Sequence, residues 1–97
     1  MSHIRPPTEQ ESTCFYDAYH YAREILKGPW KEKEDLMMHD PFTCYLYARD
    51  ALKWSPKYNH FYIRSLESGM LRISDLPQKL KDDEMFQTLY FKSKVLK

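Results

Sequence analysis

The chain has 97 residues, of which 42% are hydrophobic and 15% aromatic, and its formal net charge is +1. This composition fits one small folded domain, in which each helix must pack on its neighbours to bury a core. Positive and negative side chains are interleaved along the chain, so no overall field attracts nucleic acid or an anionic membrane.

The sequence also indicates a cellular setting. Cys14 and Cys44 are isolated and form no Cys-x-x-Cys spacing, and residues 1–7 contain no apolar run of the signal-peptide kind. No segment approaches the roughly 20 apolar residues that span a bilayer. We therefore expect a protein of the reducing cytoplasm with no membrane contact.

The first segment combines a leader with a long helix. Residues 1–7 are predicted to be a flexible leader, because Pro6 and Pro7 cannot continue a helix. Thr8 and Glu11 stand at the spacing of a capping box, which predicts a helix over 8–27. Residues 8–97 are expected to form a single domain.

A stop signal and a short helix follow. Gly28 can adopt the left-handed conformation that ends a helix, and Pro29 prevents continuation. Residues 29–38 predict a short second helix that returns antiparallel to the first. Its expected apolar contacts are Trp30, Leu36 and Met37.

The clearest helix signal lies at 40–53. Asp40 can cap the first turn, and Pro41 fits the first helical position. The following apolar residues share one side of a 3.6-residue period, which is therefore the predicted core side: Cys44, Tyr45, Ala48, Ala51 and Leu52. The opposite side is expected to face solvent: Thr43, Arg49, Asp50 and Lys53.

The second half is predicted to be less regular. At 54–57 a tight turn around Pro56 replaces the expected short helix. Further helices are predicted from 58 to Gly69, from Ser74 or Asp75 to about Lys81, and from 84 to 97. About six helices are expected, with no strand of any length.

The chain carries internal similarity. Residues 21–27 and 47–53 match at five of seven positions with an offset of 26, and weaker copies lie at 62–69 and 89–97. Such self-similarity is typical of helical repeats. It predicts an all-α fold in which long and short helices alternate in a small, solenoid-like repeat bundle.

The pattern Ala18-Tyr19-His20-Tyr21-Ala22, Leu26-Lys27-Gly28-Pro29-Trp30, Glu34, Asp40-Pro41 and Tyr45-Leu46-Tyr47-Ala48 resembles a short tandem repeat of small tailed-bacteriophage proteins. The resemblance is close over 18–53 and weak from Tyr58 onward, and the sequence departs from it at 54–56. It implies a virus-encoded protein that acts in the host bacterial cytoplasm. It implies a scaffold and no reaction.

Motifs for metal or cofactor chemistry are weak. Zinc ligand pairs are normally two to four residues apart, and no such pair occurs among Cys14, Cys44, His20 and His39. A Cys-His nucleophile has no better support. We expect no metal site, no cofactor and no catalytic residues, and the two cysteines are interpreted as packing residues.

The charged residues are interpreted as parts of solvent-exposed helix surfaces. Acidic residues at 32–35 and 82–84 lie among or beside lysines, which favours a mixed-charge helix face over a metal site or a mimic of DNA phosphates. The aromatic and basic residues from Tyr90 to Lys97 form too small a patch to predict nucleic-acid binding.

Aromatic residues supply the candidate contact sites. Tyrosine and tryptophan are common anchors of protein interfaces. The predicted partner-binding residues lie at and just after 54–57, where the repeat pattern is interrupted: Trp54, Tyr58, His60 and Tyr62. Trp30 is expected to pack against the core and hold the short helix to it. Tyr16, Tyr21 and Tyr47 lie off the apolar stripe and are expected to pack between repeats, or to meet a partner.

The expected function is therefore noncatalytic. We expect a small phage-type protein that binds and modulates, by inhibition, a host protein such as a defence or transcription component. Two alternatives stay open: an accessory protein that binds nucleic acid, and a structural or assembly protein that self-associates, for example as a homodimer.

Overall fold

The computed structural model describes residues 4–95 and is helical throughout, with no strand in that range. The predicted all-α class is therefore confirmed for these residues. The seven α-helices are α1 (Glu9–Thr13), α2 (Phe15–Tyr21), α3 (Glu34–Met37), α4 (Pro41–Leu46), α5 (Asn59–Glu67), α6 (Gln78–Lys81) and α7 (Glu84–Val95). Two π-turns extend α2 and α4, namely η1 (Ala22–Leu26) and η3 (Tyr47–Ala51), and three 3₁₀ turns lie in the connections: η2 (Lys31–Lys33), η4 (Pro56–Tyr58) and η5 (Ile73–Asp75).

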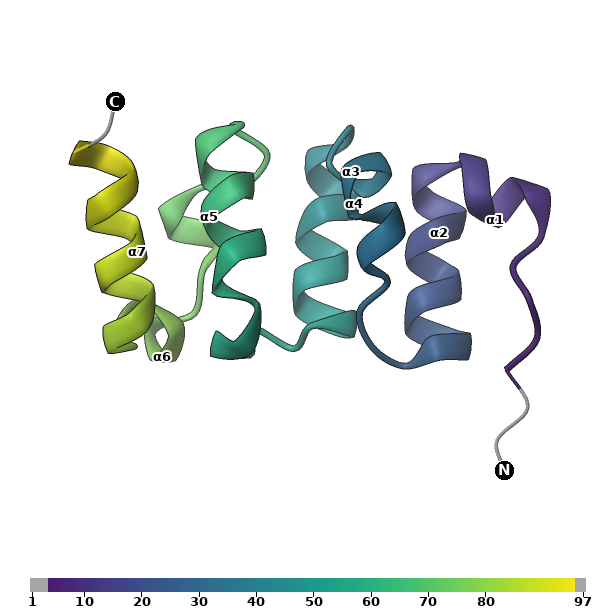
Figure 1. Ribbon diagram of the computed structural model, residues 1–97, viewed down its shortest axis with the longest axis horizontal. Coiled ribbons are helices and arrows are strands. Elements are labelled where there is room, and N and C mark those ends of the chain that lie inside the picture. Colours follow the sequence, from purple (N-terminus) through teal and green to yellow (C-terminus); the bar gives the residue numbers. More distant parts are fainter. Residues whose placement is uncertain (1–3, 96–97) are drawn as a thin grey trace.

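The longer helices stand side by side in a row (Figure 1), in the order α2, α4, α5 and α7, within a molecule of 41 × 28 × 20 Å. The first two run in the same direction, and the last two run in the opposite direction. Side-chain contacts agree with this arrangement. Cys44 at the start of α4 meets Ser65 near the end of α5, and Ser93 near the end of α7 donates to Glu67 at the end of α5.

The reversal occurs where the sequence lacks a second short helix. Between α2 and α4, the segment 27–40 with α3 runs back alongside the helices to the level at which α2 begins, so α4 starts beside the start of α2 (Figure 1). Between α4 and α5 only residues 52–58 are available, so the chain turns directly and α5 runs antiparallel to α4. Ser55 caps the turn at Pro56 by accepting from the Lys57 N–H. The predicted tight turn is confirmed, although it contains one turn of 3₁₀ helix.

The prediction of one uninterrupted helix over 8–27 is wrong at Cys14. The capping box is present, since Glu11 N–H donates to Thr8 Oγ1 at 3.1 Å and Thr8 N–H donates to Glu11 Oε1 at 2.9 Å. Cys14, however, has an extended backbone with φ −106° and ψ 126°. The chain bends there, so α1 ends at Thr13 and α2 begins at Phe15.

The two π-turns end in similar ways, although Trp54 after the second one is left-handed as well, with φ 53°. Lys27 and Lys53 both have a left-handed backbone, with φ of 53° and 55°. The N–H of the next residue then reaches back six positions, from Gly28 to Ala22 O and from Trp54 to Ala48 O, one position further than the 6→1 bond of a Schellman motif. The expectation that Gly28 itself is left-handed is wrong, because the stop falls one residue earlier.

The core lies between the helices of the row and beneath α3. The core side predicted for α4 is largely confirmed, since Cys44, Ala48, Ala51 and Leu52 are buried. Thr43 was expected to face solvent but is fully buried. The reason is that α4 has neighbours on both sides, and Asp40 caps it by accepting from the Thr43 backbone and hydroxyl, both at 2.9 Å.

Several aromatic side chains that lie off the apolar stripe are also buried. Tyr21 and Tyr47 are 3% and 0% exposed, which confirms packing, whereas Tyr16 is 44% exposed. Met37 of α3 is fully buried, and Trp30 packs against the core as expected. Helical wheels of single helices miss such residues, because each helix has more than one packed side.

The predicted leader is attached to the domain at one described point. Arg5 pairs with Glu11 at 2.7 Å, and its carbonyl oxygen accepts from the hydroxyl of Tyr21. Residues 4–7 are exposed, and residues 1–3 of this expected leader lie outside the described range. Among the described helices, none has the length and apolar character needed to cross a membrane.

Candidate functional site

A hollow of about 480 Å³ lies where the short segment 31–37 faces the start of α5. We call it the central hollow, and seven residues line it: Lys31, Glu34, Lys57, Tyr58, His60, Phe61 and Arg64. The lining comes from three parts of the chain, namely η2 with α3, η4, and the first two turns of α5. The tight turn at Pro56 makes this possible, because it reverses the chain so that α5 runs back past the segment 31–37.

Glu34 is the acidic residue of this lining. The buried hydroxyl of Tyr47 donates to Glu34 Oε2 at 2.7 Å and accepts from the backbone N–H of Trp30 at 2.9 Å. Burial raises the pKa of Glu34, although the Tyr47 hydroxyl and the positive charges of Lys31 and Arg64 act in the opposite direction. The carboxylate is therefore held in place at the edge of the core.

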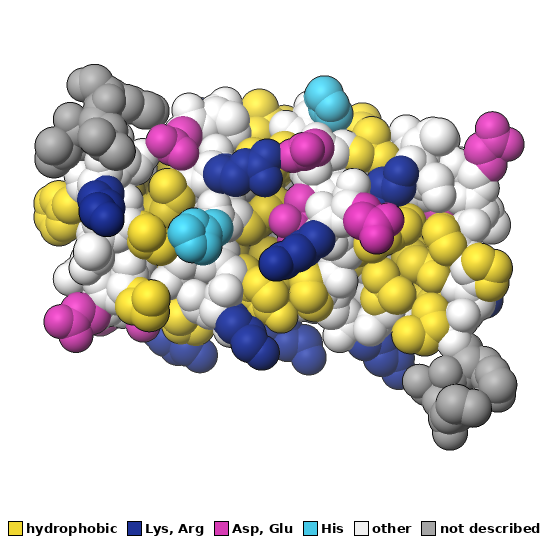
Figure 2. All heavy atoms as spheres, viewed as in Figure 1, with side chains coloured by type: hydrophobic (Ala, Val, Ile, Leu, Met, Phe, Trp, Pro, Cys, Tyr) yellow, Lys and Arg dark blue, Asp and Glu magenta, His cyan; other side chains and the backbone are white. Residues whose placement is uncertain are grey.

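Basic side chains surround the carboxylate. Lys31 and Lys57 are exposed, and neither takes part in an ion pair among the described residues. Arg64 pairs with Asp35 at 2.5 Å, with side-chain exposures of 54% and 81%. Figure 2 shows acidic, basic and histidine side chains interspersed over the middle of one face, with hydrophobic atoms exposed between them.

The four residues predicted to bind a partner do not form one surface. Tyr58 and His60 line the central hollow, and His60 is exposed. Trp54 lies elsewhere, partly buried, with its ring 5.7 Å from the Tyr45 ring and 5.5 Å from the Tyr62 ring. Tyr62 is 0% exposed, so its prediction as a contact residue is wrong. Its hydroxyl donates to Ser55 O at 2.9 Å and holds the turn before α5.

The remaining lining residues were not predicted as a site. Lys31 and Glu34 belong to a segment interpreted as a solvated mixed-charge face, and Arg64 pairs with a residue 29 positions away. No local pattern links these segments. The one available signal was the shortened connection at Pro56, which brings α5 toward the helix that precedes the connection.

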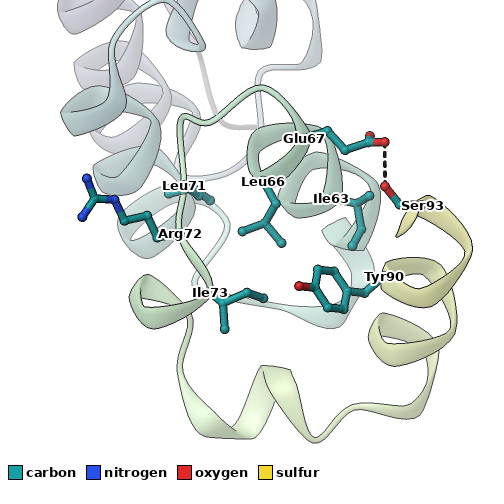
Figure 3. Close-up of a pocket in the computed structure, with 8 residues that line it drawn as sticks. All are labelled: Ile63, Leu66, Glu67, Leu71, Arg72, Ile73, Tyr90 and Ser93. Carbon is teal, nitrogen blue, oxygen red and sulfur yellow. Dashed lines mark hydrogen bonds between the residues drawn. The ribbon is translucent and has the colours of Figure 1, made fainter. Parts of the chain in front are cut away.

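A second, smaller hollow of about 240 Å³ lies between α5, the segment 71–73 and α7. Figure 3 shows Ile63, Leu66, Ile73 and the ring of Tyr90 around its apolar interior. The polar groups at its edge either already form a hydrogen bond with each other or point away from the interior. Ser93 donates to Glu67 at 2.6 Å, and the Arg72 guanidinium points away from the interior (Figure 3). This hollow therefore has an apolar interior but no charged group that is available to recognise a ligand.

The cysteines and histidines form no chemical centre. Cys44 is buried, and burial raises the pKa of its thiol to about 11, while its Sγ contacts Ser65 Oγ at 3.2 Å. A thiol in this state is a poor nucleophile. Within residues 4–95 no three His, Cys, Asp or Glu side chains come together as a metal site.

We take the central hollow as the candidate site, because charged and aromatic groups from three parts of the chain line it together. No protein-family model matches this chain, and no match was found among curated proteins or solved structures.

Proposed function

We propose that this is a small noncatalytic binding protein, built from helical repeats of the tailed-phage type, that binds and inhibits a host bacterial protein such as a defence component. In this proposal it acts in the host cytoplasm. The binding surface is the central hollow, together with the exposed side chains of Lys57 and His60 at its edge.

The observation that carries the proposal is the composition of the hollow. Aromatic side chains of Tyr58 and Phe61 and the guanidinium of Arg64 meet there at one concave place. Tyr and Arg are among the residues that contribute most to protein interfaces. A concave surface of this kind serves recognition without any catalytic group.

Two features that each occur twice support the repeat part of the proposal. The left-handed residues Lys27 and Lys53 are 26 positions apart. So are two arginine-tyrosine pairs, in which Arg23 lies 5.2 Å from the Tyr19 ring and Arg49 lies 5.8 Å from the Tyr45 ring. Neighbouring helices with the same ends and the same surface pairs are what copies of one unit would produce.

Self-association is the second candidate function. It is favoured by two large apolar side chains of the final long helix, Met85 and Phe91, which are 71% and 63% exposed. Large contiguous apolar patches mark contact surfaces, whereas Met85 and Phe91 line separate hollows of α7, so self-association remains the second candidate. A nucleic-acid role has less support, because the net charge of +1 provides no broad basic surface.

Affinity capture from bacterial lysate tests the proposal. Wild-type protein should retrieve one host protein reproducibly, and the Lys57→Ala/His60→Ala variant should lose it. The matched control is Lys79→Ala/His39→Ala, which removes the same two residue types at exposed positions outside the hollow. Loss of the partner after nuclease treatment would favour nucleic acid instead. Concentration-dependent oligomer mass without any retrieved protein would favour self-association.

A further inference from the structure

We infer that the central hollow recognises an acidic segment of its partner protein, in which a carboxylate stands beside an aromatic or large aliphatic side chain. This inference rests on the proposed function, because it specifies the chemistry of the partner at the same site.

The first argument is the local charge. Lys31, Lys57 and Arg64 bring three positive charges to the lining, against the one carboxylate of Glu34. With Asp35, which pairs with Arg64 at the edge of the hollow, three cations face two carboxylates, so the hollow keeps a local excess of positive charge. Complementary charge guides partners to an interface and excludes partners of the wrong sign.

The second argument is that these cations remain available. Glu34 already receives a hydrogen bond from Tyr47, and neither Lys31 nor Lys57 has a carboxylate partner within the described part of the chain. Arg64 has one, Asp35, but both side chains are more than half exposed. Exposed pairs of this kind contribute only about 0–1 kcal/mol, so a partner's carboxylate can replace Asp35 at little cost.

The third argument is the apolar part of the lining. The partly exposed ring of Tyr58 provides most of the apolar surface beside the cations, because Phe61 behind it is only 4% exposed. A volume of about 480 Å³ accommodates one or two side chains of a partner. The hollow therefore has one position for an anion and one for an apolar group.

A protein carboxylate is favoured over a nucleic-acid phosphate. Nucleic-acid binding needs cations along a track that neutralises several phosphates. Here the cations converge on one hollow instead of following a track. An acidic segment of a folded protein needs only this single point of contact.

Titration of the isotope-labelled protein with the peptide acetyl-EEFEE-amide, followed by NMR, tests this inference. The peptide should shift backbone signals of residues 31–35 and 57–64, and the affinity should fall as salt is raised. Acetyl-SSFSS-amide and acetyl-KKFKK-amide should bind at least about tenfold more weakly. A short oligothymidine should compete poorly with the acidic peptide.

Two charge reversals provide the matched comparison. Lys57→Glu should weaken binding of the acidic peptide by about tenfold, whereas Lys79→Glu, the same change at an exposed position outside the hollow, should leave it within about twofold. The spectrum of each free variant establishes that the fold is intact, since both positions are on the surface.

Several outcomes would overturn the inference: no shifts, equal binding of the basic peptide, stronger binding of oligothymidine, or equal loss in both variants. If the acidic peptide fails while lysate capture still depends on Lys57 and His60, the partner chemistry is wrong and the proposed function stands. If the peptide binds the hollow and no host protein is captured, the inferred chemistry stands and the proposed function fails.

Discussion

The hydroxyl of Tyr47 accepts a hydrogen bond of 2.9 Å from the backbone N–H of Trp30, 17 residues earlier in the chain. The same hydroxyl donates to Glu34 at 2.7 Å. One hydroxyl thus holds two points, Trp30 and Glu34, of the returning segment that forms one wall of the central hollow. The stability of the core and the shape of the candidate site are linked at this residue.

Tyr47→Phe removes this link and should destabilise the protein by about 1–3 kcal/mol, because a partly buried N–H and a partly buried carboxylate both lose a partner. Chemical unfolding followed by circular dichroism measures the change. Tyr16→Phe is the control, since Tyr16 is 44% exposed, and its effect should stay within about 0.5 kcal/mol. Equal effects of the two substitutions would show that the Tyr47 hydroxyl has no such role.

The buried alanines of the two neighbouring helices should respond alike. Ala22 and Ala48 are both 0% exposed and occupy equivalent positions before the left-handed stops. Ala22→Leu and Ala48→Leu should each cost about 1–3 kcal/mol of unfolding free energy, because the packed interior has no room for three more carbon atoms. Lys79→Leu, at an exposed position, is the control. A neutral result at either alanine would contradict close packing there.

These buried positions show how much the sequence alone could predict. Caps depend on residues three positions apart, so Thr8 with Glu11 and Asp40 with Thr43 mark real helix starts. The burial of the Tyr47 ring depends on what packs against it from other helices. A single helical period cannot contain that information.

The candidate site was only partly predictable for the same reason. Tyr58 and His60 were identified because they follow a broken repeat, but Tyr62, two residues further, points into the core. Lys31 and Arg64 meet at the hollow because the connection at 54–57 reverses the chain direction. Local spacing indicates that the repeat is broken there, but it does not indicate which segments then face each other.

The two cysteines should differ in reactivity. Cys44 is 0% exposed and the pKa of its thiol is raised to about 11, whereas Cys14 is partly exposed at the bend between α1 and α2. At pH 8 iodoacetamide should modify Cys14 in the native protein and Cys44 only after unfolding, as mass spectrometry can measure. The native Cys14→Ser variant should therefore stay unmodified. Modification of Cys44 without unfolding would contradict its place in the core.

Lowering the pH should weaken the ion pair between Arg5 and Glu11 and so reduce the stability of the fold. The Arg5 guanidinium, followed by the backbone N–H of Thr8, lowers the pKa of Glu11 from 4.5 to about 2. Because the folded-state pKa is the lower one, ionised Glu11 stabilises the fold above pH 4.5, and this contribution is lost as the pH falls toward 2. Glu11→Gln should therefore flatten the stability profile between these values.

The comparison for this pH effect is Glu9→Gln, which changes an exposed glutamate of the same helix. Thermal unfolding of both variants between pH 2 and pH 6 gives the profiles. If Glu9→Gln flattens the curve as much as Glu11→Gln, the pairing with Arg5 does not account for the acid sensitivity.

The central claim is that the hollow formed by α3 and the start of α5 contacts a host protein. Photo-crosslinking in living bacteria tests it most directly, with a benzophenone amino acid placed at position 60 in the hollow or at position 79 outside it. The account predicts one discrete adduct with a host protein from position 60, lost on Lys57→Glu, and none from position 79. No adduct from position 60, or the same adducts from both positions, would contradict it.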